Sequence, residues 1–187
     1  MTDFEYLSVL ISIVLGLGIT NILGGLGAIV RNRHRTKLYA PLVTTLVLMF
    51  VVHVQTWWTM FGLRGIREWN ILEFFVVLMQ PTILYLASSM LVPDFSEAGE
   101  IDLRAQYHRE RRWFFGTMFA LICLSLVRPV VLSGRLTAIP DLIGHGVFLI
   151  AIAAGLATDS DRVHKFVSGF MLVFFIAYIA TLFVQLN

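Results

Sequence analysis

The chain has 187 residues, of which 58% are hydrophobic and 14% are charged, and its formal net charge is +2. A soluble domain averages about 25% charged residues, so this composition excludes an ordinary water-soluble domain. The net charge is too small to indicate a partner by itself, and we expect no nucleic-acid partner. The length predicts one domain over residues 1–187, with the lipid bilayer as its surroundings.

Six apolar stretches predict helices that cross a membrane. The stretches cover residues 4–30, 39–63, 70–92, 113–133, 139–157 and 166–186. Each is close to the length of about 20 residues that the hydrocarbon core of a bilayer requires. The predicted fold class is therefore all-α, a polytopic membrane helical bundle with six transmembrane helices. The N-terminus has no basic segment of the kind that begins a secretory signal, so we expect no cleaved leader.

The basic residues between these stretches predict an orientation. Ten of the 14 Lys and Arg residues fall in the loops 31–38, 93–112 and 158–165, whereas the alternate loops hold only Arg64, Arg67 and Arg135. Cytoplasmic loops are enriched in Lys and Arg. We therefore expect both termini on the outer, periplasmic side of a bacterial inner membrane.

The polar loops carry few other signals. Residues 93–112, the longest polar stretch, predict a short surface helix that runs into the fourth span. His34, His108 and His164 all fall in loops on the basic side. We expect these three histidines to be solvated.

The first span carries small residues at every fourth position. They are Ser8, Ser12, Gly16, Thr20, Gly24 and Ala28. Small residues at this spacing allow two helix backbones to approach closely within a membrane. The stripe packs either against another span of the same chain, the interpretation we favour, or against a second copy or a partner membrane protein.

Polar residues inside the spans gather in the outer half of the bilayer. The candidate substrate or ion pathway consists of His53, Gln55, Glu73, Gln80, Arg128, Asp141 and His145. Charged groups at membrane depth are costly and usually face a bundle interior or a wet cavity. Asp141 and His145 are four residues apart and share a helix face. His53 and Gln55 point about 200° apart, so only one of them faces a given cavity.

Arg128 is the strongest single candidate in this set. Its guanidinium stays charged, so it needs a carboxylate, backbone carbonyls or an anionic ligand. Asp141 and Glu73 lie at a matching depth in the predicted topology. Either one of them forms a structural ion pair with Arg128, or Arg128 binds an anion or a substrate.

Two histidines raise the question of a cofactor. His53 and His145 lie at similar depths on different spans, a placement that bis-histidine haem ligation requires. Together with Asp141 and Glu73 they also have the chemistry of a metal site. Neither spacing is a motif, however, and no sequence signature of a nucleotide site or of hydrolytic catalysis occurs. We expect no cofactor, and no enzyme activity of the kinds found in soluble proteins.

Three functions remain open. The most concrete is a small transporter or channel with a polar cavity in the outer half of the bilayer, in which Asp141 and His145 carry a coupling proton. The alternative is a non-catalytic structural or regulatory subunit of a membrane complex, or a homo-oligomer, that uses the small-residue stripe for docking. An intramembrane enzyme or haem protein is the third.

Overall fold

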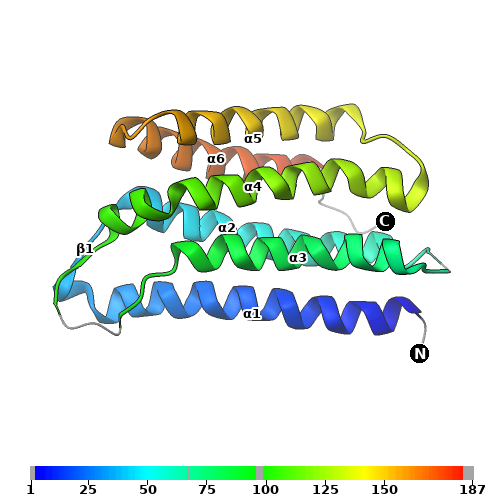
Figure 1. Ribbon diagram of the computed structural model, residues 1–187, viewed down its shortest axis with the longest axis horizontal. Helices are drawn as coiled ribbons and strands as arrows, with labels where there is room; N and C mark the ends of the chain where they lie inside the picture. The colour runs from blue at the N-terminus through cyan, green and yellow to red at the C-terminus, as the bar shows by residue number, and fades with distance from the viewer. Residues whose placement is uncertain (1–2, 67, 96–98, 183–187) are drawn as a thin grey trace.

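The structure, a computed structural model, describes residues 3–66, 68–95 and 99–182. Its long helices are α1 (Asp3–Arg31), α2 (Ala40–Thr59), α3 (Ile71–Leu91), α4 (Leu103–Ser133), α5 (Ile139–Ala157) and α6 (Asp161–Leu182) (Figure 1). The short 3-10 helices are η1 (Arg33–Arg35) and η2 (Met60–Leu63). The two-residue strands β1 (Thr36–Lys37) and β2 (Ile101–Asp102) pair in parallel.

All six long helices are long and apolar enough to cross a membrane, which confirms the predicted fold class. Large apolar side chains on the outer surfaces of these helices are exposed: Leu17 is 57% exposed, Ile150 72% and Val173 68%. A water-soluble protein rarely exposes contiguous apolar surface on this scale, so a multi-pass membrane protein is indicated. The end of the sixth predicted span, beyond Leu182, lies outside the described residues.

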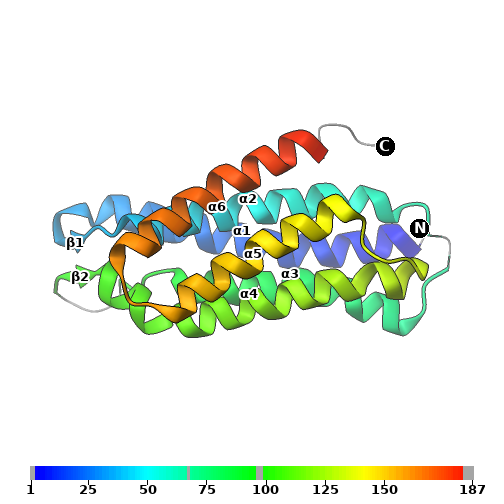
Figure 2. The same cartoon turned by 90° about the horizontal axis from the view of Figure 1, so that it is seen from above.

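The helices pack as a ring of five with one helix outside it. The contacts join α2 to α3, α3 to α4, α4 to α5, α5 to α6 and α6 back to α2, while α1 packs on α2 and α3. The helix axes follow the long dimension of the molecule, and α5 and α6 cross the others obliquely (Figure 2). This ring encloses the space in which a site can form.

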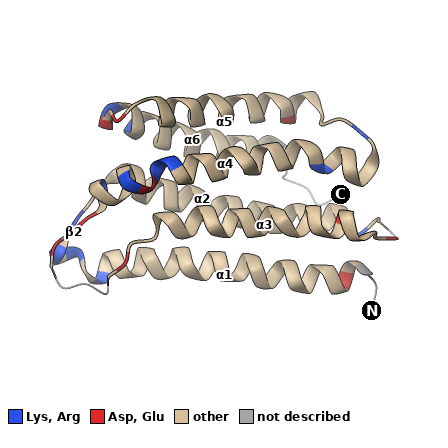
Figure 3. Ribbon diagram, viewed as in Figure 1, with Lys and Arg blue, Asp and Glu red and all other residues tan. Residues whose placement is uncertain are grey.

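The two ends of the bundle differ in charge. The end at which β1, β2 and the start of α4 lie collects most of the Lys and Arg (Figure 3). We call it the basic end, and we call the other, where α1, α3 and α5 begin, the terminal end. Arg67, which enters the loop count, lies outside the described residues. The placement of both termini outside the cell stays a prediction.

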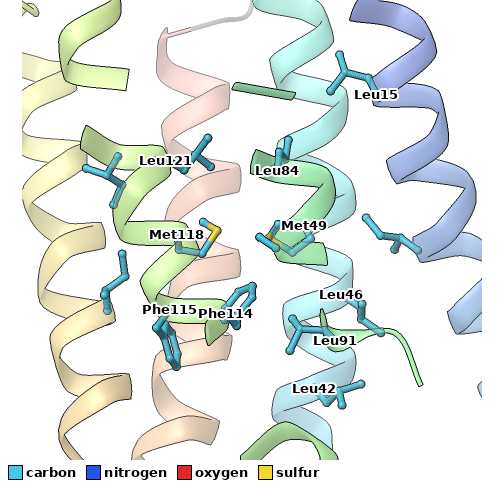
Figure 4. Packing of buried hydrophobic residues seen from close by; sticks show 14 of the residues in the cluster. Leu15, Leu42, Leu46, Met49, Leu84, Leu91, Phe114, Phe115, Met118 and Leu121 are labelled. Carbon is cyan, nitrogen blue, oxygen red and sulfur yellow. The ribbon is translucent and has the colours of Figure 1, made fainter. Parts of the chain in front are cut away.

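The core joins the helices through large apolar side chains. Leu15 of α1, Met49 of α2, Leu84 of α3 and Met118 of α4 belong to one cluster of buried residues (Figure 4). Interdigitated side chains of this kind make many weak dispersion contacts. In lipid, such packing takes the place of a hydrophobic driving force between helices.

Most of the small-residue stripe of α1 faces away from this bundle. Ser12 and Thr20 are exposed, and a Cβ added at Gly16 or Gly24 would meet nothing within 4 Å. The buried face of α1 is instead formed by Leu7, Ile11, Leu15, Gly18, Ile22, Gly25 and Ile29. Residues at this alternating spacing of three and four form a straighter apolar seam than a strict period of four. Packing of the stripe against another span of the chain therefore has no support at Ser12, Gly16, Thr20 and Gly24, whereas Ser8 and Ala28 are half-buried.

The second half of the polar stretch before the fourth span is helix. Asp102 caps α4, and its Oδ1 accepts hydrogen bonds from the backbone N–H groups of Arg104 and Ala105 at 2.9 and 3.0 Å. An aspartate at this position satisfies helix N–H groups that otherwise have no partner. The helix therefore begins at Leu103 instead of Trp113 and continues without a break into the membrane span.

Candidate functional site

A cavity of about 520 Å³ lies within the ring, towards the terminal end. It reaches the segments that follow α2 and α4, where Gly62, Ile66 and Thr137 line it. Towards the middle of the bundle it ends on Met118 and Phe148. Volumes of about 300–1,000 Å³ are typical of small-molecule sites in proteins.

Five of the seven predicted pathway residues line this cavity. They are Gln55 of α2, Gln80 of α3, Arg128 of α4, and Asp141 and His145 of α5. The other two, His53 and Glu73, are not in its lining. Four different helices thus bring polar groups to one space.

Arg128 has a neutral partner within the bundle. Its Nη1 donates a hydrogen bond to Gln80 Oε1 at 2.7 Å. Among the described residues, no acidic side chain forms an ion pair with Arg128, and Gln80 is its only hydrogen-bond acceptor. The predicted structural pair with Asp141 or Glu73 is therefore absent. A guanidinium offers five N–H donors, and most of them remain available here.

Asp141 is occupied by a neutral donor. Its Oδ1 accepts a hydrogen bond from the hydroxyl of Tyr178 on α6. Asp141 also lies in the first turn of α5, where the helix dipole favours a negative charge. In the part of the chain that the structure describes, no Lys, Arg or His side chain forms an ion pair with Asp141.

His145 has both ring nitrogens engaged. Nδ1 lies 2.5 Å from the Asp141 carbonyl oxygen, which can only accept, so Nδ1 carries the proton. Nε2 lies 2.8 Å from Ser125 Oγ and accepts from that hydroxyl. A histidine so placed links α5 to α4 across the cavity wall.

His53 and Gln55 point in different directions, as their spacing predicts. His53 is fully buried, its Nδ1–H donates to the Met49 carbonyl at 2.7 Å, and its ring lies against Gly18 of α1. Gln55 lines the cavity, and its side chain has no hydrogen bond to a described residue. Of the two, Gln55 faces the bundle interior, and His53 joins α2 to α1.

Glu73 serves the start of α3. Its carboxylate accepts from the backbone N–H of Asn70 at 3.1 Å, and the Asn70 side chain accepts from the backbone N–H of Glu73 at 3.0 Å. This reciprocal pair is a capping box, which satisfies two backbone donors at the helix terminus. The sequence Asn70-x-x-Glu73 carries that signal and explains why Glu73 stays outside the cavity.

Among the polar cavity groups that were not predicted, Ser125 and Tyr178 contact predicted residues. Ser125 lies three residues before Arg128 on the same face of α4, so the helical period could have identified it. Tyr178 reaches Asp141 from α6, and nothing in the sequence pairs those helices. Pro129 also lines the cavity and leaves the Ser125 carbonyl without its usual helical donor.

The cofactor alternatives do not gain support from these positions. His145 lines the cavity and His53 lies against α1, so the two rings do not face a common space in which a haem could lie. Across residues 3–66, 68–95 and 99–182, no three His, Cys, Asp or Glu side chains gather as metal ligands would. The cavity therefore has the chemistry of hydrogen bonding and charge.

A second, much smaller cavity of about 40 Å³ follows towards the basic end. Met118 and Phe148 line both cavities, so these two side chains separate them. Thr45 and Tyr107 lie in the wall of the second cavity, and the rest of that wall is mostly apolar. The stretch between the two cavities is closed by side-chain packing.

Beyond the second cavity, the start of α6 is tied to α4 and to the start of α2. Asp161 accepts hydrogen bonds from Tyr39 Oη at 2.9 Å and from Arg104 Nε at 2.8 Å, and its Oδ1 lies 3.2 Å from His108 Nε2. Burial raises the pKa of Tyr39, and the bond to Asp161 raises it further, so the hydroxyl remains a donor. We call these contacts of Asp161 the latch.

A second set of contacts lies behind the latch. The guanidinium of Arg111, only 4% exposed, pairs with Asp159 at 2.5 Å and donates to the carbonyls of Gly155 and Thr158. His164 is fully buried and lies 3.1 Å from the Tyr107 hydroxyl. The basic end is therefore closed by polar as well as apolar contacts.

Two of the three loop histidines are not solvated. His164 has no exposed surface, and the side chain of His108 is 18% exposed. Both belong to helices because α4 begins earlier, and α6 begins earlier, than the apolar stretches do. Both rings pack against Tyr107 and against each other, and His108 also packs against Tyr39. The prediction of solvated rings is wrong for these two residues, and His34 is exposed.

The chain has no match among protein-family models, curated proteins or solved structures.

Proposed function

We propose that this protein is a small membrane transporter of the alternating-access type, and that the large cavity is its substrate site. The observation that carries the proposal is the form of this cavity. It reaches the loops of the terminal end, converges on charged and hydrogen-bonding groups, and stops at Met118 and Phe148. Convergent polar groups at membrane depth are a mark of substrate and ion pathways.

The closed stretch beyond the cavity favours a transporter over a channel. A channel needs a continuous pore when it conducts. Here the small second cavity is separated from the first by two side chains and from the basic end by the latch contacts. Weak polar contacts at one end and two bulky side chains in the middle are elements that rearrange without unfolding a helix. This arrangement corresponds to a state open towards the terminal end.

The direction of opening follows from the charge distribution. The basic end carries most of the Lys and Arg, and cytoplasmic loops are enriched in both. With the basic end in the cytoplasm, the cavity opens to the outside. Arg128 then attracts the substrate, and Asp141 and His145, which line the same cavity, are the proposed carriers of a coupling proton.

Cysteine labelling tests whether the cavity contains water. In a Cys123→Ala background, Ser125→Cys should react readily with a polar, membrane-impermeant maleimide added at the terminal side, because Ser125 lines the cavity. Val127→Cys is the matched control: it lies two residues away on α4, is 50% exposed and faces away from the cavity lining, towards lipid. We expect slow reaction there. Equal reaction at the two positions, or none at Ser125→Cys, contradicts a water-filled cavity.

A second candidate function is docking of another membrane protein or a second copy through the stripe of α1. The observation that favours it is the exposure of the stripe, which leaves Gly16 and Gly24 open to close approach. Small residues left on a lipid-facing surface are typical of helix interfaces. This function and transport are compatible, because the stripe lies on α1, outside the ring that holds the cavity.

Gly16→Leu tests the docking function. A side chain at Gly16 meets nothing within the chain, so the fold should be unaffected while close approach of a partner helix is prevented. Gly116→Leu on α4 is the matched control, since its Cβ also meets nothing within 4 Å. We expect energy transfer between labelled copies in vesicles to fall severalfold for Gly16→Leu alone. Unchanged transfer in both variants contradicts a self-association role for the stripe.

A further inference from the structure

The cavity changes character along its length. Towards the mouth its lining includes Thr59, Ser125, Arg128, Asp141 and Tyr178, and towards the floor Val52, Met118, Ile122, Phe148 and Phe175. The change runs in the same direction on α2, α4, α5 and α6. Along α4, Met118 and Arg128 are about 15 Å apart at the usual rise of a helix. The site is therefore an amphipathic slot, polar near the mouth and apolar at its floor.

The charges at the mouth are not equivalent. Arg128 is held by the neutral amide of Gln80 and has no ion pair with a described residue. Asp141 already accepts from the Tyr178 hydroxyl and lies at a helix N-terminus. Neither group has an ion-pair partner among the described residues, but Asp141 has a hydroxyl donor and a helix N-terminus, whereas most N–H groups of Arg128 remain available for an oxyanion. Two parallel N–H groups of an arginine match a carboxylate in geometry.

We propose that the slot binds a small amphipathic anion, whose carboxylate or similar oxyanion meets Arg128 and whose aliphatic part lies on the floor. This inference rests on the proposed function, since it names the substrate class of the same cavity. Gln55, whose amide has no hydrogen-bond partner among the described residues, offers a further donor on the opposite wall. Arg128 would repel a cation, and a purely polar solute would make no favourable contacts with the apolar side chains of the floor.

Binding of radiolabelled octanoate to the full chain in nanodiscs of neutral lipid tests this class. We expect saturable binding that hexanoate competes for better than butyrate, while octanol and octylamine compete poorly. Arg128→Gln should weaken binding by about tenfold or more, because a hydrogen bond to a charged group is lost. Arg135→Gln is the matched control: it removes an exposed guanidinium from the segment after α4 and should leave binding unchanged.

The floor is tested by chain length. Ile122→Trp fills the apolar end of the slot while Arg128 remains in place. We expect this variant to lose octanoate binding and to retain butyrate binding, measured with labelled butyrate in competition with unlabelled butyrate. If Ile122→Trp binds neither ligand and is no longer monodisperse, it has not folded. In that case Arg128→Gln, whose side chain lies at the partly exposed mouth of the slot, provides the test of the inference.

The arms of the experiment also separate two sources of the ligand. Palmitate supplied in the nanodisc bilayer competes if the anion is a membrane lipid, whereas only the short-chain acids compete if it comes from water. Absence of saturable octanoate binding, or equal binding by Arg128→Gln, overturns the inference. If Ser125→Cys is nevertheless labelled, the water-filled cavity stands and only the anion class is wrong. If Ser125→Cys is not labelled either, the proposed function fails as well.

Discussion

Replacing Gly18 by alanine is expected to lower the free energy of unfolding by about 1–3 kcal/mol, the usual cost of overpacking a core. A Cβ at this position would lie 2.2 Å from His53 Nε2 and 2.7 Å from Cδ2. The ring has little freedom to move, since it has no exposed surface and its Nδ1–H is bonded to the Met49 carbonyl. Reversible unfolding of the purified protein in mixed micelles measures the change.

The second half of this prediction is a double-mutant cycle. His53→Ala removes the obstructing ring, so Gly18→Ala should be far less costly in that background, with a coupling of about 0.5–3 kcal/mol. Gly16→Ala is the matched control on the same helix, because nothing lies within 4 Å of its added Cβ. It should be neutral, or stabilising by about 0.5–1 kcal/mol through helix propensity. If Gly18→Ala changes the free energy of unfolding no more than Gly16→Ala does, Gly18 of α1 does not lie against the His53 ring of α2.

The candidate cavity shows how far composition and spacing lead. Five residues in the spans are too polar to face lipid: Glu73, Gln80, Arg128, Asp141 and His145. The free-energy cost of placing them in lipid predicts that they turn inward. Four of them do line the cavity. Glu73 and Asp141 both lie in the first turn of a helix, but only Glu73 follows an N-cap residue, Asn70, that forms a capping box with it. The N-cap of α5 is Ala138, which has no side chain for such a pair, and the Asp141 carboxyl lines the cavity.

Other features depend on helix neighbours that a single chain does not reveal. The small residues of the α1 stripe have the right spacing for close packing, but this spacing does not indicate which side of α1 contacts the bundle. Gly18 takes part in the close contact with α2 because His53 happens to face it. In the same way, His108 and His164 are buried only because α4 and α6 run beyond the apolar stretches and lie together.

Opening the latch is expected to expose the second cavity to the basic side. Asp161→Ala removes the acceptor shared by Tyr39, Arg104 and His108, so the start of α6 loses its ties to α2 and α4. With Thr45→Cys in the Cys123→Ala background, labelling by an impermeant maleimide from the basic side should rise severalfold. Lys37→Gln, which breaks the exposed pair with Glu100, is the control and should leave labelling unchanged.

The same variant separates a transporter from a channel. In an alternating-access transporter, opening the basic end closes the terminal end. Ser125→Cys in the Asp161→Ala background should then lose reactivity from the terminal side. The reason is that Met118 and Phe148 line both cavities, so their side chains cannot move out of both cavities at the same time. The two accessibilities would then change in opposite directions, as a two-state equilibrium biased by one contact requires. Labelling that rises at Thr45→Cys while Ser125→Cys stays reactive would instead mean a continuous pore. No change at either position would mean that the latch is a structural tie that does not control access at the basic end.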